Sequence, residues 1–162
     1  MRFLTAMRVC LPPESHPHLA ARAEGKEIDR KLLHDGLDYW LACSDIVLVE
    51  GAGGLLSPLG ESDYVADLAR NFGFPILIVA RNALGTINHT LLTLHAAQTF
   101  REGLKIAGII LNNRAPPGND PSTTSNRQEL AFRLSVPILA EVFWRTEKIE
   151  VGIGPDTMIV FS

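Results

Sequence analysis

Four short apolar runs, rich in Val and Ile, recur along the chain with helix-like segments between them. The predicted strands lie at 46–49, 75–80, 106–112 and 136–142. Apolar runs without polar alternation are typical of strands that are buried on both faces, as in parallel sheets. Strands that alternate with helices indicate a doubly wound sheet. The sequence therefore predicts an α/β fold with a mostly parallel sheet and helices on both faces.

Turn and capping residues place the intervening helices. Helices are expected at about 29–43, 63–73, 87–102 and 125–134. Asp29 and Asp63 are predicted N-caps, and Gly73 is a predicted C-cap. Ser125 with Gln128 predicts a capping box. Residues 1–17 are expected to be an extended segment before the first helix, and residues 157–161 an additional edge strand. Asp63 and Asp67 are four residues apart, so they are expected to lie on one solvent-exposed face of their helix.

The overall composition excludes several classes of protein. At 162 residues, one domain spanning 1–162 is expected. The net charge of −3 and the lack of a dense basic cluster argue against a nucleic-acid surface. No apolar run approaches the roughly 20 residues of a membrane span, and no signal peptide is expected. Cys10 and Cys43 have no metal-ligand spacing, which suits a reducing, cytoplasmic location.

Polar residues follow the predicted strands, and in an open α/β sheet ligands bind just past the carboxyl ends of strands. The segments at this edge are 50–54, 81–88, 112–113 and 141–144. Glu50 precedes Gly51, Gly53 and Gly54, and an acid beside free N–H groups suits a metal-bound phosphate. A glycine-rich connection with Glu50 in solvent explains the pattern equally well.

Two further segments of this edge have the chemistry of a binding site. The amide of Asn112 offers a donor and an acceptor together, as an adenine edge requires, although an Asn that bonds its own loop is an equal alternative. Gly85 and Thr86 open a helix whose free N–H groups can hold a carboxylate or phosphate, but most helix starts hold only a cap or water. A Walker A loop, G-x-x-x-x-G-K-[ST], occurs nowhere in the sequence.

Taken together, several blocks resemble dethiobiotin synthetase. These blocks are 47–54, 66–69, 75–80, 84–93 and 107–112. The resemblance runs from about Pro12 to Trp144, and its most specific part is Leu-Gly-Thr-Ile-Asn-His at 84–89. The strand-and-glutamate pattern at 47–50 by itself also resembles cobyrinic and cobyric acid synthetases, which are relatives in the same P-loop class.

The resemblance implies an ATP- and CO2-dependent ring closure in biotin biosynthesis. Diaminopelargonate is carbamated, ATP phosphorylates the carbamate, and the second amine displaces phosphate to form the ureido ring. The implied ligand of Mg²⁺ is Glu50. The implied contacts to phosphate or carbamate are Gly51, Ala52 and Gly53. The implied nucleotide contacts are Asn112, which reads adenine, with Asn113, Val142, Phe143 and Trp144. The implied substrate contacts, across a homodimer interface, are Gly85, Thr86 and Asn88.

The sequence departs from the family because the Walker A strand and helix, the catalytic Lys and a Mg²⁺-binding Asp are missing. The resemblance places the Walker A strand between the strand that ends at Glu50 and the strand that starts near Pro75. A gap in mid-sheet, or direct pairing of those two strands, is therefore expected. We expect a dimer or higher oligomer, since missing units leave an apolar flank exposed.

Three hypotheses remain open for the activity. The chain is the C-terminal part of a longer synthetase, or it is half of a split enzyme that a P-loop partner chain completes, or it is a non-enzymatic remnant or interaction module. No residue of this chain replaces the Walker Lys, so no catalytic residue is assigned here. Turnover by these 162 residues alone is not expected.

Overall fold

The computed structural model describes residues 19, 21–22, 25, 27–51, 53–116, 118 and 120–146, together with the backbone of 157–161. Its helices are α2 (Arg30–Cys43), α3 (Val65–Phe72), α4 (Thr86–Thr99) and α5 (Asn126–Arg133), with the 3-10 helix η1 (Pro121–Thr124). Its strands are β1 (Leu48–Glu50), β2 (Ile76–Arg81), β3 (Ile106–Asn112), β4 (Ile138–Val142) and β5 (Thr157–Phe161). The predicted extended segment at 1–17 and the predicted contact Ala52 lie outside the described residues.

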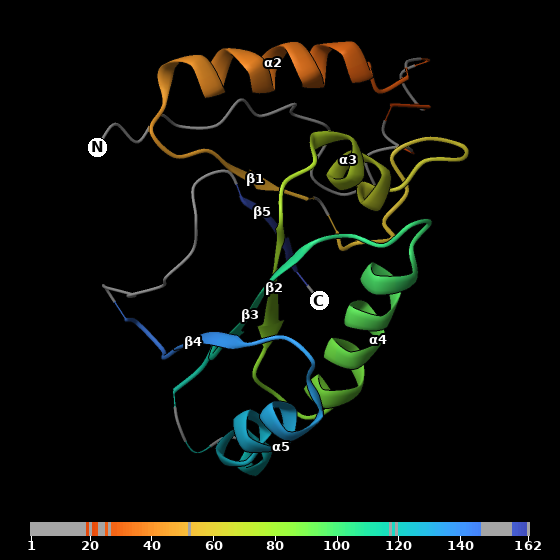
Figure 1. Cartoon of the computed structure of the whole chain (residues 1–162). Coiled ribbons are helices and arrows are strands. Elements are labelled where there is room, and N and C mark those ends of the chain that lie inside the picture. The colour runs from red at the N-terminus through yellow and green to blue at the C-terminus, as the bar shows by residue number, and fades with distance from the viewer. Residues whose placement is uncertain are drawn as a thin grey trace.

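The strands form one parallel sheet, which confirms the predicted α/β class. Among the described residues the sheet has five strands in the order β1-β5-β2-β3-β4, and every pair of neighbours is parallel. Figure 1 shows the strands side by side, with β2 pointing toward the end of the molecule where α5 lies. The carboxyl ends of β2, β3 and β4 thus meet at one edge.

Strand β5 lies in the interior of the sheet, so the prediction of an edge strand at 157–161 is wrong. Its residues pair with β1 on one side, as in Glu50↔Ile159, and with β2 on the other, as in Leu77↔Ile159. The expected gap, or direct pairing of β1 with β2, is also wrong, because β5 fills the position between them. Backbone pairing on both sides is the physical reason: each neighbouring strand would otherwise present unpaired N–H and C=O groups.

Strand β1 is shorter and more exposed than its apolar run predicts. Only Leu48–Glu50 are in the strand, and Leu48 is 44% exposed. Within the described part of the chain, β1 pairs only with β5 and stands at the edge of the sheet. The predicted burial on both faces is therefore wrong for β1, because Leu48 and Glu50, which share one face of the strand, are both exposed.

The core lies between one face of β2 and β3 and three helices. Ile76, Ile78 and Ala80 of β2 are fully buried, as are Ile109 and Leu111 of β3. They form one apolar cluster with residues of α3, α4 and α5, among which Val65, Leu94 and Leu130 are buried. This packing fixes where β2 and β3 end, and it therefore positions the polar residues that follow them.

Gly108 allows β4 to lie close against β3. Its φ is 154°, and a Cβ added there would come within 2.7 Å of both the Pro137 carbonyl oxygen and the Leu139 side chain. A larger residue would push β4 away, since backbone atoms cannot yield as a flexible side chain can. The close approach brings the end of β4 beside the end of β3, where Asn112 pairs with Val142.

Helix caps agree with the sequence in part. Asp29 accepts a hydrogen bond from the Leu32 N–H (3.2 Å), and Gly73 has a left-handed φ of 72°, so both predicted caps are confirmed. Asp63 is not the N-cap of α3, which is Tyr64. The Ser125–Gln128 capping box is also wrong: the Ser125 side chain makes no cap bond and donates to the Ser122 carbonyl oxygen instead.

The predicted solvated face of α3 is wrong as well. Asp67 is buried, accepts from the Tyr64 N–H (3.0 Å) and pairs with the Arg101 guanidinium (2.8 Å). Asp63 pairs with Arg30. A tertiary partner from the end of α4 thus draws one of the two carboxylates into the interior. None of the described helices is long and apolar enough to span a membrane.

Candidate functional site

Polar side chains from the ends of three neighbouring strands join in one hydrogen-bond network. Asn82, directly after β2, is 5% exposed, and its Nδ2 lies 2.9 Å from Asn113 Oδ1 and 3.3 Å from Glu141 Oε1. Asn113, directly after β3, donates from Nδ2 to Glu141 Oε1 (3.1 Å) and to the Val142 carbonyl oxygen (3.0 Å). Because buried amides must be paired, this network holds the three strand ends in one arrangement.

Helix α5 and the segment before it extend the network to the loop between β2 and α4. Asn126 Nδ2 donates to Asn82 Oδ1 (2.8 Å) and to the Ala83 carbonyl oxygen (3.2 Å). Asp120 Oδ2 accepts from the Leu84 N–H (2.7 Å). The loop 82–84 is therefore bound at three successive residues, which fixes the start of α4 relative to the strand ends.

A cavity of about 830 Å³ opens beside this network. Its lining includes Arg81, Asn113, Arg114, Glu141, Phe143 and Trp144. Phe143 and Trp144 remain 59% and 43% exposed, respectively. Exposed aromatic rings, amides and basic side chains around one cavity offer stacking, hydrogen bonds and positive charge to a flat, anionic ligand.

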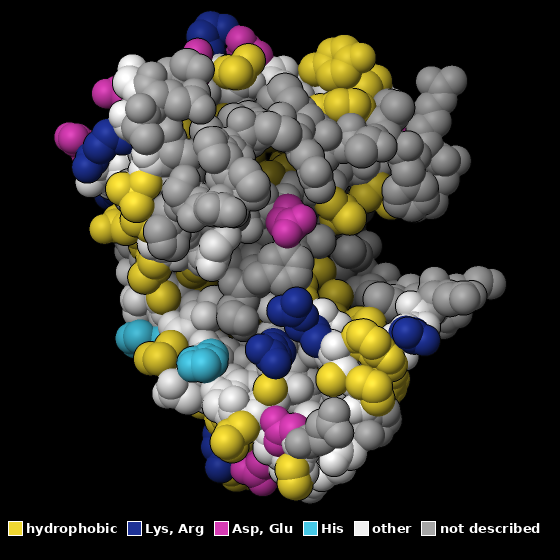
Figure 2. Space-filling view, turned by 180° about the vertical axis from the view of Figure 1, so that it is seen from behind, with side chains coloured by type: hydrophobic (Ala, Val, Ile, Leu, Met, Phe, Trp, Pro, Cys, Tyr) yellow, Lys and Arg dark blue, Asp and Glu magenta, His cyan; other side chains and the backbone are white. Residues whose placement is uncertain are grey.

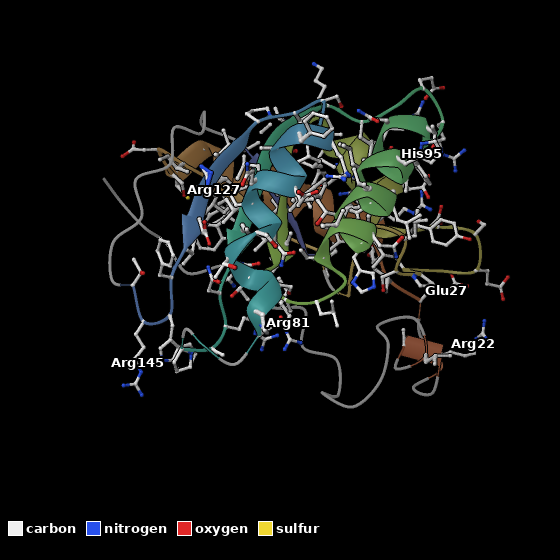
Figure 3. The ribbon with its side chains drawn as sticks, turned by 90° about the horizontal axis from the view of Figure 1, so that it is seen from below. Arg22, Glu27, Arg81, His95, Arg127 and Arg145 are labelled. Atoms are coloured by element: carbon white, nitrogen blue, oxygen red, sulfur yellow. The ribbon has the colours of Figure 1, made fainter. Side chains whose placement is uncertain are left out.

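Two views locate this edge. Figure 3, seen from below, shows Arg81 at the strand ends, with Arg127 and Arg145 on the α5 and β4 side, whereas Arg22 and Glu27 lie at the opposite side of the molecule. Figure 2 shows basic side chains gathered beside a hydrophobic patch on the lower half of the molecule. Positive charge and apolar surface are thus neighbours on that face.

The structure brings some of the predicted nucleotide contacts together and separates others. Asn113, Phe143 and Trp144 line the cavity, but Asn112 and Val142 are not among its lining residues. The Asn112 carbonyl oxygen accepts from the Asn82 N–H (2.8 Å), and no described residue makes a hydrogen bond with the Asn112 side chain. In contrast, the Asn113 amide donates both of its N–H groups within the network, to Glu141 Oε1 and to the Val142 carbonyl oxygen.

The predicted substrate contacts lie at the start of α4. Gly85 is its N-cap, with a φ of 91° that favours glycine. Asn88 is exposed, whereas Thr86 is buried with its Oγ1 3.5 Å from Thr90 Oγ1. The Thr86 hydroxyl therefore belongs to the interior of the helix, and Asn88 is the side chain here that faces outward.

Comparison with known proteins adds the family. A model of the AAA domain family matches residues 4–149. This chain belongs to the AAA domain family. Within it, the resemblance to dethiobiotin synthetases is confirmed by relatives that carry this name.

Several of these relatives are named ATP-dependent dethiobiotin synthetase BioD. The protein of Anaeromyxobacter dehalogenans is 49% identical over 131 residues, which cover 81% of this chain and 57% of that protein. The protein of Anoxybacillus flavithermus is 40% identical, covering 78% and 56%, and that of Rhodopirellula baltica is 36% identical, covering 96% and 60%, respectively. This AAA-domain chain thus spans somewhat more than half the length of these curated relatives.

Glu50 ends β1, but it lies two strands away from β2 and short of the carboxyl end of that strand. Glu50 and Leu77 both pair with Ile159 of β5, so Glu50 is level with the second residue of β2, four residues before Arg81. With about 4.8 Å between strands and about 3.3 Å of rise per residue, the backbone of Glu50 lies about 16 Å from the end of β2. Glu50 is exposed, and nowhere in the described part of the chain do three His, Cys, Asp or Glu side chains come together as metal ligands. Mg²⁺ is usually held by one or two carboxylates with phosphate oxygens and water. Glu50 fits as one ligand of such a set.

A second cavity, of about 600 Å³, lies between α3 and the segment before α2. Its charged lining is occupied by ion pairs: Arg30 with Asp63, Arg101 with Asp67, and Arg22 with Glu61 at 3.7 Å. Arg101 itself lies outside the lining, and its partner Asp67 is buried. Apart from Glu27, the charged residues of the lining are thus engaged in ion pairs.

Four residues that build the strand-end site received no individual role from the sequence: Asn82, Asp120, Asn126 and Glu141. Asn82 and Glu141 lay within the predicted edge segments 81–88 and 141–144, whereas Asp120 and Asn126 lay outside them. The sequence does contain a pattern that points to Asn82: it directly follows the apolar strand β2, just as Asn113 directly follows β3. Asp120 and Asn126 carry no such signal. Their roles depend on partners 36 and 44 residues away in sequence.

Asp120 gives the site a testable pH dependence. The Ser122 hydroxyl, followed by the Leu84 and Ser122 N–H groups, holds the pKa of this carboxyl below its ordinary value of 3.8. A lowered pKa means that stabilisation is present above about pH 4 and is lost as the pH falls through the lower folded-state value. We expect the urea midpoint to fall below about pH 4, and to fall less steeply in Asp120→Asn.

The measurement is urea unfolding of both proteins between neutral and acidic pH. Asp38→Asn, on the exposed side of α2, is the matched control and should keep the pH profile of the unmodified chain. Identical acid profiles for the unmodified chain and Asp120→Asn would show that the contacts of the Asp120 carboxylate with Ser122 and Leu84 contribute nothing to stability.

Proposed function

We propose that this chain carries the base-binding part of an ATP-dependent dethiobiotin synthetase. The observation that supports this most is the 830 Å³ cavity at the ends of β2, β3 and β4, lined by Asn113, Phe143 and Trp144. A flat base can lie against the exposed aromatic rings, since stacking of this kind contributes about 1–3 kcal/mol per base. The relatives' name supplies the nucleotide, ATP.

The remaining roles are part of the same proposal. Asn112 reads the adenine edge, Val142 belongs to the nucleotide-side loop, and Glu50 is one ligand of Mg²⁺. The phosphate or carbamate contacts are Gly51, Ala52 and Gly53. The contacts to the carboxylate of diaminopelargonate are Gly85, Thr86 and Asn88, of which exposed Asn88 is the most accessible.

Turnover needs a phosphate-binding loop, and this sequence contains none. We therefore assign base binding to this chain and propose that phosphoryl transfer requires a Walker A loop from residues outside these 162, in the same polypeptide or in a partner chain. A cytoplasmic location and a homodimer complete the proposal. Leu84 and Leu92, both exposed at the start and on the outer side of α4, support such an association because exposed apolar side chains favour contact with a second copy.

A second candidate function is nucleotide binding without turnover. It is favoured by the position of β5, which makes the sheet continuous from β1 to β2. A sheet without a gap can persist without an additional strand. Both candidate functions use the same cavity for the base. They differ only in whether a phosphate-binding loop from other residues completes the site.

Titration with ADP tests the shared part. In a Trp40→Phe background the fluorescence reports Trp144, the second of the two tryptophans. We expect a saturable change on addition of ADP, and roughly tenfold weaker binding in Phe143→Ala because one stacking surface is lost. Phe132→Ala, an exposed Phe of α5 outside the cavity lining, is the matched control and should bind as the parent does.

Unchanged fluorescence up to millimolar ADP would refute the proposed base site. Phosphate release from ATP in the presence of Mg²⁺, bicarbonate and diaminopelargonate then separates the two candidates. Neither predicts release by this chain alone, whereas addition of a polypeptide that carries the Walker A loop restores it only if the chain is part of a synthetase.

A further inference from the structure

The Glu141 carboxylate is held in a defined orientation at the wall of the 830 Å³ cavity. Its side chain is 16% exposed. Oε1 lies 3.1 Å from Asn113 Nδ2 and 3.3 Å from Asn82 Nδ2. Asn113 is the main donor to Oε1, and Asn82 Nδ2, which also donates to Asn113 Oδ1 (2.9 Å) and the Thr123 carbonyl oxygen (3.2 Å), is the longer second contact. Both amides are held by the strand ends, so together they orient the carboxylate.

The second oxygen of Glu141 has no comparable partner. Its nearest cationic neighbour is Arg127, whose Nε lies 3.6 Å from Oε2, which is too far for a hydrogen bond. In the part of the chain that the structure describes, no residue donates a hydrogen bond to Oε2. A mostly buried carboxylate oxygen with spare acceptor capacity is costly unless a donor reaches it.

Neighbouring polar groups do not compete for this role. The Asn113 amide gives its N–H donors to Glu141 and Val142 and accepts at Oδ1 from Asn82. The Asn82 side chain is likewise engaged at both ends. Among the side-chain oxygens of Asn82, Asn113, Asp120 and Glu141, Oε2 of Glu141 is the one to which no described residue donates a hydrogen bond.

We propose that Glu141 determines specificity in this pocket, with Oε2 accepting a hydrogen bond from an N–H or O–H donor of the bound nucleotide. Asn82 and Asn113 are the positioning residues that aim it. The inference rests on the proposed base site. Such a donor has two sources in ADP, the exocyclic amine of the base and the ribose hydroxyls, and the experiment below distinguishes them.

Glu141→Gln reverses the polarity of this contact without changing its shape. The two amide donors at Oε1 require an acceptor, so the Gln carbonyl oxygen takes that position. The Gln NH2 group then occupies the position of Oε2 and presents a donor to the pocket. An acceptor for the ligand becomes a donor, and the network behind it stays satisfied.

Calorimetric titration of the full chain with three probes tests the proposal. ADP is expected to bind Glu141→Gln about tenfold more weakly or worse, because a hydrogen bond to a charged group is replaced by two facing donors. If the donor is the base amine, inosine diphosphate, which carries an oxygen in its place, binds the variant more tightly than the unmodified chain. If the donor is the ribose, 2′,3′-dideoxy-ADP binds both proteins equally.

Equal binding of all three probes to both proteins would overturn the proposal, as would a uniform loss for all three, which indicates a structural role only. Glu141→Ala gives a second measure: it removes the acceptor without adding a donor, so ADP weakens but inosine diphosphate does not improve. Glu129→Gln, an exposed residue of α5 that pairs with Arg133, removes the same charge outside the pocket and should bind every probe as the unmodified chain does.

The experiment also separates this inference from the function on which it rests. If the unmodified chain does not bind ADP, the proposed base site fails and this inference fails with it. If the unmodified chain binds ADP and Glu141→Gln binds it equally well, the base site stands and only the role of Glu141 is wrong.

Discussion

Replacing Ile159 with proline is expected to lower the free energy of unfolding by about 3 kcal/mol or more, since proline removes a ladder donor in mid-sheet and leaves a buried carbonyl unpaired. Ile159 pairs with Glu50 on one side and with Leu77 on the other. In the described part of the chain β5 is the one strand that pairs with β1. The substitution should therefore also release Leu48–Glu50.

Urea unfolding and amide hydrogen exchange measure these two effects. Ile159→Val is the matched control, because it keeps the N–H donor and the β-branched shape and should cost about 0.5–1.5 kcal/mol at most. If Ile159→Pro leaves the urea midpoint unchanged and the amides of β1 protected, β5 does not lie between β1 and β2 in solution.

Replacing Asn82 with alanine is the second large effect that we expect, with a loss of about 3 kcal/mol in the free energy of unfolding. Asn82 is 5% exposed and joins Asn113, Glu141 and Asn126. Removing the Asn82 amide takes away the acceptor of Asn126 Nδ2 and the donor to Asn113 Oδ1. Asn126 is 3% exposed, and a buried group left unpaired costs about 1–3 kcal/mol.

Thermal and urea unfolding of Asn82→Ala measure this loss. Asn71→Ala, an exposed residue of α3, makes the same chemical change outside the network and should cost less than about 0.5 kcal/mol. A loss of that same small size for Asn82→Ala would mean that the network contributes nothing to holding the strand ends together.

The local elements could be read from the sequence because their signals are local. The apolar run of β3 gave Ile106–Asn112, and the structure has a strand with these bounds. Asp29 and Gly73 cap their helices as expected, since capping needs only residues within one turn. Where a tertiary partner competes, the local signal fails: Asp67 pairs with Arg101, which lies 34 residues away.

The candidate site could be predicted only as a set of segments. The polar residues after each strand indicate which edge binds a ligand, because parallel strands present their carboxyl ends together. They do not indicate which side chains meet. Asn113, Phe143 and Trp144 line the cavity, but Asn112 does not, since alternate residues of a strand face opposite sides of the sheet.

The sequence by itself determined the class of the fold, the alternation of its strands and helices, and the edge at which polar residues gather, because hydrophobic period and turn chemistry act over a few residues. Only the tertiary structure decided the order of the strands, with β5 between β1 and β2. It alone also decided the network that joins Asn82 to Asn113, Asn126 and Glu141, over separations of 31, 44 and 59 residues, respectively. Contacts at such separations depend on which elements pack side by side, and no local pattern encodes that.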